Sequence, residues 1–159
     1  DMVSGKDVPF ATRANLWQVG WKIFRDYPLT GCGFRCVDLV NDQYPDPLYE
    51  KSREPTQSIK HLRGMHNNFV QLAVDTGILG LTAWLGIWIC FFRLLYHRSK
   101  AIKRDSPERW VIYGSTATVS AFLAGGCFET NFYDSEVAMV LFFIMALPFT
   151  GSYNKKPVQ

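Results

Sequence analysis

Three mostly apolar runs without charged residues dominate the second half of the chain. They cover residues 77–92, 111–128 and 137–150, whereas charged residues crowd the first 66 positions. Crossing the hydrocarbon core of a bilayer takes about 20 mostly apolar residues, with about 17 as the lower limit. A buried helix of a soluble protein would instead show a polar stripe every turn or two. The runs therefore predict an all-α fold with three transmembrane helices, at about residues 67–96, 110–128 and 135–151.

The first part of the chain predicts one amphipathic helix, over residues 13–26. Thr12 is a suitable N-cap, and the helix ends before Pro28 because the residue preceding a proline avoids the helical region. The apolar stripe of this helix consists of Trp17, Trp21 and Phe24, widened by Leu16 and Ile23. A helix of this kind with basic residues on its other faces suits a membrane surface. An ordinary amphipathic helix packed against its own loop is an equal alternative.

A long irregular loop follows, because residues 38–64 are rich in proline and charge. Cys32 and Cys36 lie just before it, and they can form a disulfide if the loop faces an oxidising compartment. Together with His61 and His66 they also match a Cys2His2 zinc site loosely, although the gap between the pairs is far longer than in a zinc finger. We expect no metal and no other cofactor.

The charges between the apolar runs predict the orientation of the chain. Residues 97–109 carry five Lys or Arg against two acids, and the tail 152–159 carries two Lys, whereas residues 128–134 carry two acids and no base. Cytoplasmic loops are enriched in Lys and Arg. Loop 97–109 and the tail are therefore expected in the cytoplasm, and residues 1–66 and 128–134 on the periplasmic or outer side. We expect membrane lipids as partners of the apolar runs and no nucleic acid.

Arg13 is the first candidate for chemistry. It falls in the first turn of the predicted helix, where free backbone N–H groups and a partial positive charge favour anions. Its guanidinium adds a planar, permanently charged fork that suits phosphate. A solvated surface arginine is the simpler alternative.

His66 is the second candidate, because it stands where the long loop enters the first predicted span. The field of a helix N-terminus disfavours an imidazolium, so the ring stays available as an acceptor or base. In the simpler alternative, Asn67 caps the helix and His66 is a bystander.

A polar stripe continues from His66 into the helix. Asn67, Gln71 and Asp75 are spaced four residues apart and share one helix face. Polar groups in a span are costly and usually face the protein interior or a watery cavity. Gly77 and Gly80 follow them and allow the close approach of another helix.

The ordered set of these motifs resembles the O-antigen ligase/polymerase family. The motifs are Arg13-x3-Trp17, Pro28-x2-Gly31-x-Gly33 and His66-Asn67-Asn68-x2-Gln71-Leu72-x4-Gly77-x2-Gly80. The resemblance covers about residues 11–95. It implies a polytopic glycosyltransferase of the bacterial inner membrane, with the GT-C-like fold of enzymes that use lipid-linked donors and an active site on the periplasmic side. The chain is then the C-terminal portion of a longer protein whose N-terminal helices complete the bundle.

The resemblance also implies the chemistry. Such enzymes take a glycan from undecaprenyl diphosphate and pass it to lipid A core, to a growing polysaccharide or to a protein hydroxyl, without metal or nucleotide. The family's essential loop arginine and histidine correspond to Arg13 and His66. Arg35, Asn67, Gln71 and Asp75 are expected to contact substrate. A membrane transport or scaffold protein without transferase activity is the alternative, although transport would predict paired ionisable residues deep in several helices.

Overall fold

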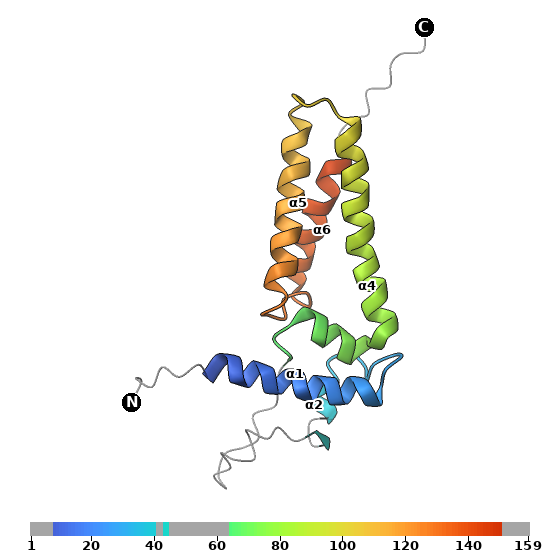
Figure 1. Ribbon diagram of the computed structural model, residues 1–159, viewed down its shortest axis with the longest axis vertical. Coiled ribbons are helices and arrows are strands. Elements are labelled where there is room, and N and C mark those ends of the chain that lie inside the picture. The colour runs from blue at the N-terminus through green and yellow to red at the C-terminus, as the bar shows by residue number, and fades with distance from the viewer. Residues whose placement is uncertain (1–7, 41–42, 45–63, 151–159) are drawn as a thin grey trace, which may run out of the picture. The chain divides into compact units, whose positions relative to one another are not determined.

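The computed structural model describes residues 8–40, 43–44 and 64–150, and their regular structure is helical (Figure 1). The helices are α1 (Val8–Asp26), α2 (Val37–Val40), α4 (Asn68–Ala101), α5 (Glu108–Gly125) and α6 (Ser135–Thr150). The all-α prediction is thereby confirmed. The chain forms two compact units. The first holds Asp1–Trp84 with Gly126–Thr130, and the second holds Leu85–Gly125 with Asn131–Gln159.

The start of α1 differs from the prediction. The helix begins at Val8 rather than Arg13, so Thr12 lies inside it and is not its N-cap. Pro9 favours the earlier start, because a proline in the first turn fixes φ and lacks only an N–H that has no helical partner there. Arg13 consequently lies in the second turn, and the anion preference of a helix N-terminus does not explain it.

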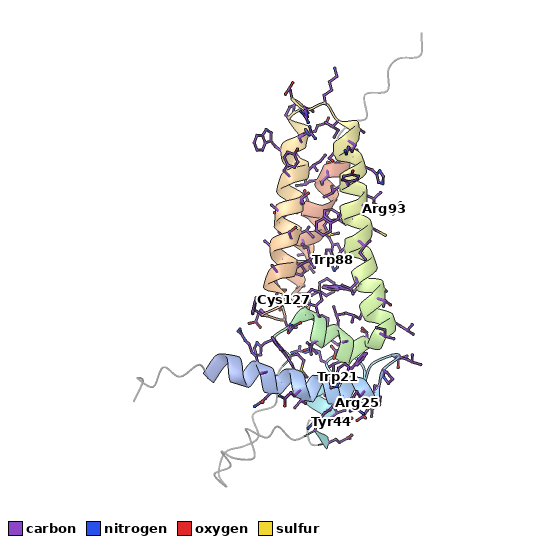
Figure 2. The ribbon with its side chains drawn as sticks, viewed as in Figure 1. Trp21, Arg25, Tyr44, Trp88, Arg93 and Cys127 are labelled. Atoms are coloured by element: carbon purple, nitrogen blue, oxygen red, sulfur yellow. A yellow bond between two sulfur atoms is a disulfide. The ribbon has the colours of Figure 1, made fainter. Side chains whose placement is uncertain are left out.

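The buried face of α1 forms the core of the first unit. Leu16, Val19 and Ile23 are at most 4% exposed and cluster with Cys36, Val37, Met65 and Val74. Packing against the chain's own later residues was one of the two predicted alternatives. The predicted stripe is partly wrong, because Trp21 is 60% exposed and stacks on Phe24 outside this core (Figure 2). The membrane-surface interpretation of this helix stays a prediction.

Helix α4 is broken at Gly77. The glycine has φ 63° and ψ −164°, a conformation that is almost restricted to glycine, and Figure 1 shows the change of direction near the start of the helix. The break separates residues 68–76, which carry Gln71 and Asp75 of the polar stripe, from residues 78–101, which are uncharged up to Phe92. Asp75 therefore lies before the break, where it is 2% exposed in the first unit.

The turn after α1 fills the break. The N–H groups of Cys32 and Gly33 donate to the carbonyls of Val74 and Asp75, at 3.0 and 3.1 Å. In return, Ile78 N–H donates to Pro28 at 2.9 Å, and Leu79 N–H to Leu29 at 3.3 Å. Backbone groups freed by a break need such replacement partners.

Two glycines make this docking possible. A Cβ on Gly31 would lie 2.3 Å from the backbone carbon of Asp75, and a Cβ on Gly77 would lie 2.4 Å from that of Leu29. A close approach at Gly77 was therefore predicted correctly, but the predicted partner was wrong. The segment that approaches Gly77 is the turn after α1 and not another helix. At Gly80 a Cβ would meet the side chain of Thr76 in the same helix, 2.1 Å away.

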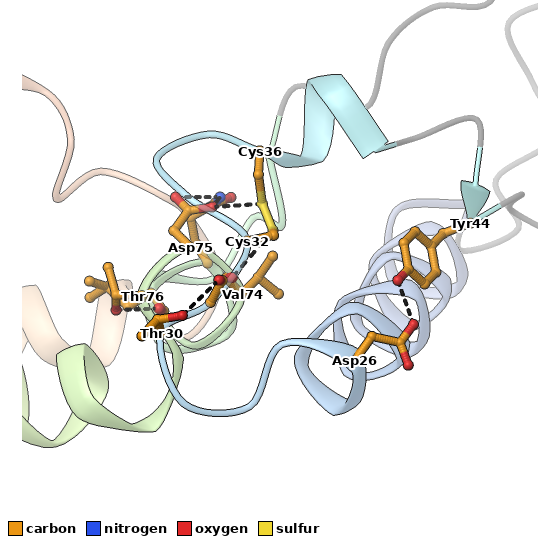
Figure 3. Close-up of a disulfide and its surroundings, with 11 residues drawn as sticks. Asp26, Thr30, Cys32, Cys36, Tyr44, Val74, Asp75 and Thr76 are labelled. Atoms are coloured by element: carbon orange, nitrogen blue, oxygen red, sulfur yellow. Dashed lines mark hydrogen bonds between the residues drawn. A yellow bond between two sulfur atoms is a disulfide. The ribbon is translucent and has the colours of Figure 1, made fainter.

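A disulfide joins Cys32 to Cys36 and closes this turn (Figure 3). The sulfur of Cys32 lies 3.4 Å from the Val74 carbonyl oxygen, and that of Cys36 lies 3.8 Å from Oδ1 of Asp75. The sequence allowed a disulfide between these two cysteines, and the structure contains it. His61 of the loose zinc pattern lies outside the described residues, which contain no group of three or more metal-ligating side chains.

The second unit combines the later part of α4 with α5 and α6. Trp88 of α4 is 3% exposed, and its ring lies 5.8 Å from that of Phe122 and 6.5 Å from that of Phe132 (Figure 2). Ser115 Oγ on α5 donates to the Ile144 carbonyl on α6 at 2.9 Å. Large apolar side chains point away from this core as well, among them Phe142 and Phe143.

One helix of the described residues, α4, is long and apolar enough to cross a membrane; its most apolar window has a mean hydropathy of 1.9. Its segment after the break, residues 78–101, rises about 36 Å, and the uncharged part of it, residues 78–92, rises about 22 Å, compared with a hydrocarbon core of about 30 Å. Helix α6 is apolar but shorter, and α5 does not meet the same criteria. The three-span arrangement remains a prediction. The proposed tail 152–159 and the proline-rich part of the long loop lie outside the described residues.

Candidate active site

Helix α1 is fixed against the His66 motif by a tryptophan. Trp17 Nε1 donates to the Met65 carbonyl at 2.9 Å, and Met65 itself is fully buried. Arg13 lies one turn before Trp17 on the same helix, so this bond fixes the position of Arg13 relative to the His66 motif. The Arg13-x3-Trp17 spacing thus has a structural reason: the tryptophan anchors the helix and the arginine reaches past it.

The turn after α5 pairs with the His66 motif residue by residue. Asn68 N–H donates to the Gly126 carbonyl at 2.7 Å, and Asn67 Nδ2 donates to the Cys127 carbonyl at 2.8 Å. The Asn67 N–H donates to Thr130 Oγ1 at 3.0 Å. A Cβ on Gly126 would lie 2.5 Å from Asn68 Nδ2, so a larger residue there would displace the Asn68 side chain. These bonds hold residues 126–130 next to residues 66–68.

Glu129 of this turn brings the two predicted catalytic residues together. Its Oε1 lies 2.8 Å from His66 Nδ1, and its Oε2 lies 4.0 Å from a terminal nitrogen of Arg13. The three side chains are between 32% and 53% exposed, so a substrate can reach all of them. Exposed ion pairs contribute only about 0–1 kcal/mol to stability. Stability alone is therefore a weak reason for this cluster.

The Glu129 carboxylate is ionised at neutral pH. Partial burial raises the pKa of Glu129, but the hydrogen bonds from His66 and from the Thr130 N–H, with the nearby charge of His66 and Arg13, outweigh it and lower that pKa below its ordinary value. An ionised carboxylate can only accept hydrogen bonds. In this cluster the Glu129 carboxylate is therefore the hydrogen-bond acceptor, and the His66 ring and the Arg13 guanidinium each face one of its oxygens.

His66 has an unusual backbone. Its φ is 46°, in the left-handed region that few residues other than glycine adopt. Non-glycine residues in such conformations cost about 1–3 kcal/mol and occur preferentially at functional sites. The neighbouring hydrogen bonds hold it: Asn67 Oδ1 accepts from the N–H groups of Phe69 and Val70, at 2.9 and 3.1 Å. Asn67 therefore caps α4, as the simpler interpretation of this residue predicts.

The predicted polar stripe is a buried hydrogen-bond network. Gln71 Nε2 donates to both oxygens of Asp75, at 3.0 and 3.1 Å, and Gln71 Oε1 accepts from the Met65 N–H at 2.9 Å. Gln71 is 3% and Asp75 2% exposed. These two residues and Asn67 connect the break in α4 with the His66 motif. Their predicted contact with substrate stays a prediction.

Arg35 is separate from this cluster among the described residues. It lies between the two bridged cysteines with an exposed side chain and a φ of 53°. Within residues 8–40, 43–44 and 64–150, no hydrogen bond, ion pair or ring contact joins it to Arg13, His66 or Glu129. Its role as a substrate contact also stays a prediction.

Sequence reasoning missed Glu129. In the sequence, Glu129 is one of the two acids that predict the orientation of residues 128–134. It lies far from His66 along the chain. The available signal was its place at the outer end of an apolar run, on the side of the membrane predicted for His66.

Together these features describe a helical membrane protein with a charged cluster at the start of its longest apolar helix. The chain belongs to the O-antigen ligase family, because the sequence profile described as O-Antigen ligase matches residues 1–85. This confirms the resemblance found in the motifs. The matched segment contains Arg13, His66 and the Gly77 break, and Glu129 lies outside it.

Among curated proteins, the chain is similar to the exopolysaccharide production protein ExoQ of Rhizobium meliloti (strain 1021). The two are 28% identical over 110 residues, which is 69% of this chain and 24% of that protein. The chain therefore spans about a quarter of the length of this relative. No solved structure matches the chain.

Proposed function

We propose that the complete protein is a glycosyltransferase that moves a glycan from undecaprenyl diphosphate to an acceptor hydroxyl on the periplasmic side of the inner membrane. The family and the ExoQ relative support a role in polysaccharide biosynthesis. The observation that supports the proposed reaction is that Arg13 and His66 both lie next to the accessible carboxylate of Glu129.

Arg13 is the proposed contact for the donor diphosphate. When the bond between the anomeric carbon and the diphosphate oxygen breaks, negative charge grows on the leaving group, and fixed positive groups stabilise it. The Arg13 guanidinium suits this task because it is always charged and offers a planar fork of donors. Its contact to Glu129, at 4.0 Å, leaves those donors largely available.

His66 is the proposed partner of the acceptor. The acceptor oxygen forms the new bond to the anomeric carbon from the side opposite the diphosphate, with inversion, and its proton passes to the imidazole. Nδ1 of His66 is occupied by Glu129, so Nε2 is the nitrogen that takes the proton. A base in this position typically contributes about 10²–10⁴-fold to the rate.

The periplasmic location has independent support in the Cys32–Cys36 bridge. Disulfides persist in oxidising compartments such as the bacterial periplasm and are rare in the cytosol. The bridge lies on the segment that the charge pattern also assigns to the periplasm. The three-span topology, with residues 97–109 and 152–159 in the cytoplasm, belongs to the same proposal.

The decisive assay for the function uses purified full-length enzyme with an undecaprenyl-diphosphate-linked glycan. We expect glycan transfer and release of undecaprenyl diphosphate, both undiminished by a chelator. Lipid A core, a polysaccharide and a glycosylatable protein are offered in parallel as acceptors, so that the preferred acceptor is identified. Absence of transfer to every acceptor, with uptake of the intact lipid-linked glycan into vesicles, would favour the transport alternative.

The topology is tested with single cysteines and a membrane-impermeant maleimide on intact spheroplasts. Cys90→Ser and Cys127→Ser remove the free thiols and leave the disulfide in place. A cysteine at exposed Asp134 should then label from outside, whereas one at exposed Ala101 should label only after lysis. Labelling of position 101 in intact spheroplasts would reverse the proposed orientation.

A further inference from the structure

We propose that Glu129 is a positioning residue that holds the His66 ring through Nδ1 and thereby turns Nε2 toward the acceptor hydroxyl. The inference rests on the proposed function and adds to it a residue outside the segment that matches the family. It is carried by the 2.8 Å contact between Glu129 Oε1 and His66 Nδ1.

The contact fixes which nitrogen carries the hydrogen. A neutral imidazole has one N–H donor and one acceptor nitrogen, and a carboxylate accepts only. Nδ1 therefore carries the hydrogen that points to Glu129, and Nε2 keeps the lone pair. Nε2 makes no hydrogen bond within the described part of the chain. A carboxylate behind the ring also stabilises the imidazolium that forms when Nε2 takes a proton, as acids that orient catalytic histidines do.

The backbone position of Glu129 does not depend on its charge. Its side chain accepts the Thr130 N–H at 3.2 Å, and the oxygen of a glutamine can accept the same bond. Residues 126, 127 and 130 are held by hydrogen bonds to Asn67 and Asn68 that do not involve the Glu129 carboxylate. The carboxylate is also about half exposed. A substitution that removes its charge should therefore leave the turn folded, which separates a role in catalysis from one in stability.

The charge of Glu129 also predicts how donor binding responds. Arg13 is the cation next to the second carboxylate oxygen, and a diphosphate that binds Arg13 comes close to a like charge. Like charges at short range disfavour binding. Removing the negative charge should therefore not weaken donor binding, whereas it disturbs the ring that takes the proton. A falling kcat with an unchanged or lower donor KM is the signature of the proposed role.

The experiment compares Glu129→Gln, Glu129→Asp and His66→Ala in the full-length enzyme. Glu136→Gln is the matched control, because Glu136 is an exposed acid at the start of α6, and it accepts a hydrogen bond from the hydroxyl of the adjacent Ser135. We expect Glu129→Gln to lower kcat about 10- to 100-fold, the usual cost of losing a partner that orients a histidine. Glu129→Asp keeps the charge and should retain more of the rate than Glu129→Gln. The control should match the wild type.

The outcomes separate this inference from the proposed function. An inactive His66→Ala with a Glu129→Gln protein that is folded and has wild-type kcat overturns the positioning role and leaves the function intact. Wild-type kcat in His66→Ala removes His66 from the reaction, and Glu129 with it. If Glu129→Gln does not accumulate, Glu129→Asp decides: a lowered kcat at unchanged donor KM supports the role, and a raised KM at wild-type kcat overturns it.

Discussion

Among the glycines of the described residues, Gly77→Ala is expected to destabilise the protein more than any other glycine-to-alanine change except the matching one at Gly31. Alanine cannot adopt φ 63° and ψ −164° without strain, which costs about 1–3 kcal/mol. Its methyl group would also lie 2.4 Å from the backbone of Leu29, so the loop must move away. Each lost hydrogen bond between loop and helix then adds about 1 kcal/mol.

Gly31→Ala should have the same consequence from the opposite side of the contact. The residue has φ 69°, and its Cβ would meet the backbone of Asp75 and Thr76 at 2.3 to 2.5 Å. Once one substitution has separated the loop from α4, the second has less left to disrupt. The double variant should therefore be less destabilised than the sum of the single ones, as expected for residues in contact.

Two further glycines serve as controls. Gly86 lies in the helical part of α4 with open space around its Cβ position, so Gly86→Ala should be neutral or stabilising by up to about 1 kcal/mol. Gly33 has φ 109° and also faces open space, so Gly33→Ala reports the cost of backbone strain alone. The measurement is the thermal stability of each detergent-solubilised variant, followed by size-exclusion chromatography. Equal stability of Gly77→Ala and Gly86→Ala would show that the break in α4 is not held by this contact.

These glycines show how far the sequence alone reaches. The motifs around Gly31 and Gly77 were recognisable as spacings, and Gly77 was expected to allow a close approach. Their mutual contact was not predictable, because it joins a loop to a helix break more than forty positions away. Hydrophobic periodicity finds continuous helices, and it places no break inside an uncharged run.

The candidate site was likewise only partly predictable from the sequence. Arg13 and His66 were identifiable from residue type and from the family motifs, although the helix-start argument for Arg13 fails because α1 begins at Val8. Glu129 was not identifiable, since only the fold brings the turn after α5 to residues 66–68. Helix boundaries were close for α5 and α6, where charged loops and the ends of apolar runs mark them. They were poorer for α1, which starts five residues before its predicted start because Thr12 imitated a cap, and for α4, which ends five residues after its predicted end.

The largest expected effect on activity follows from replacing Arg13 or His66. Arg13→Ala should lower kcat and raise the donor KM together, because a charge-assisted contact that strengthens as the diphosphate departs serves both binding and catalysis. Arg13→Lys should restore little of either, since an ammonium cannot reproduce the planar fork. Arg25→Ala is the control, because Arg25 is an exposed arginine of the same helix.

His66→Ala should leave donor binding intact and lower kcat by about 10²–10⁴-fold if the imidazole accepts the proton. His66→Gln separates that role from simple orientation of the acceptor: a glutamine can still hydrogen-bond a hydroxyl but is no base, so substantial residual activity would assign orientation alone. His97→Ala replaces another exposed histidine and should match the wild type. The assay is glycan transfer at several donor concentrations, after the amount of each folded variant in the membrane has been measured. Wild-type kcat and KM in folded Arg13→Ala or His66→Ala would remove that residue from the mechanism, and the cluster around Glu129 would then be a structural contact between α1, the start of α4 and the turn after α5.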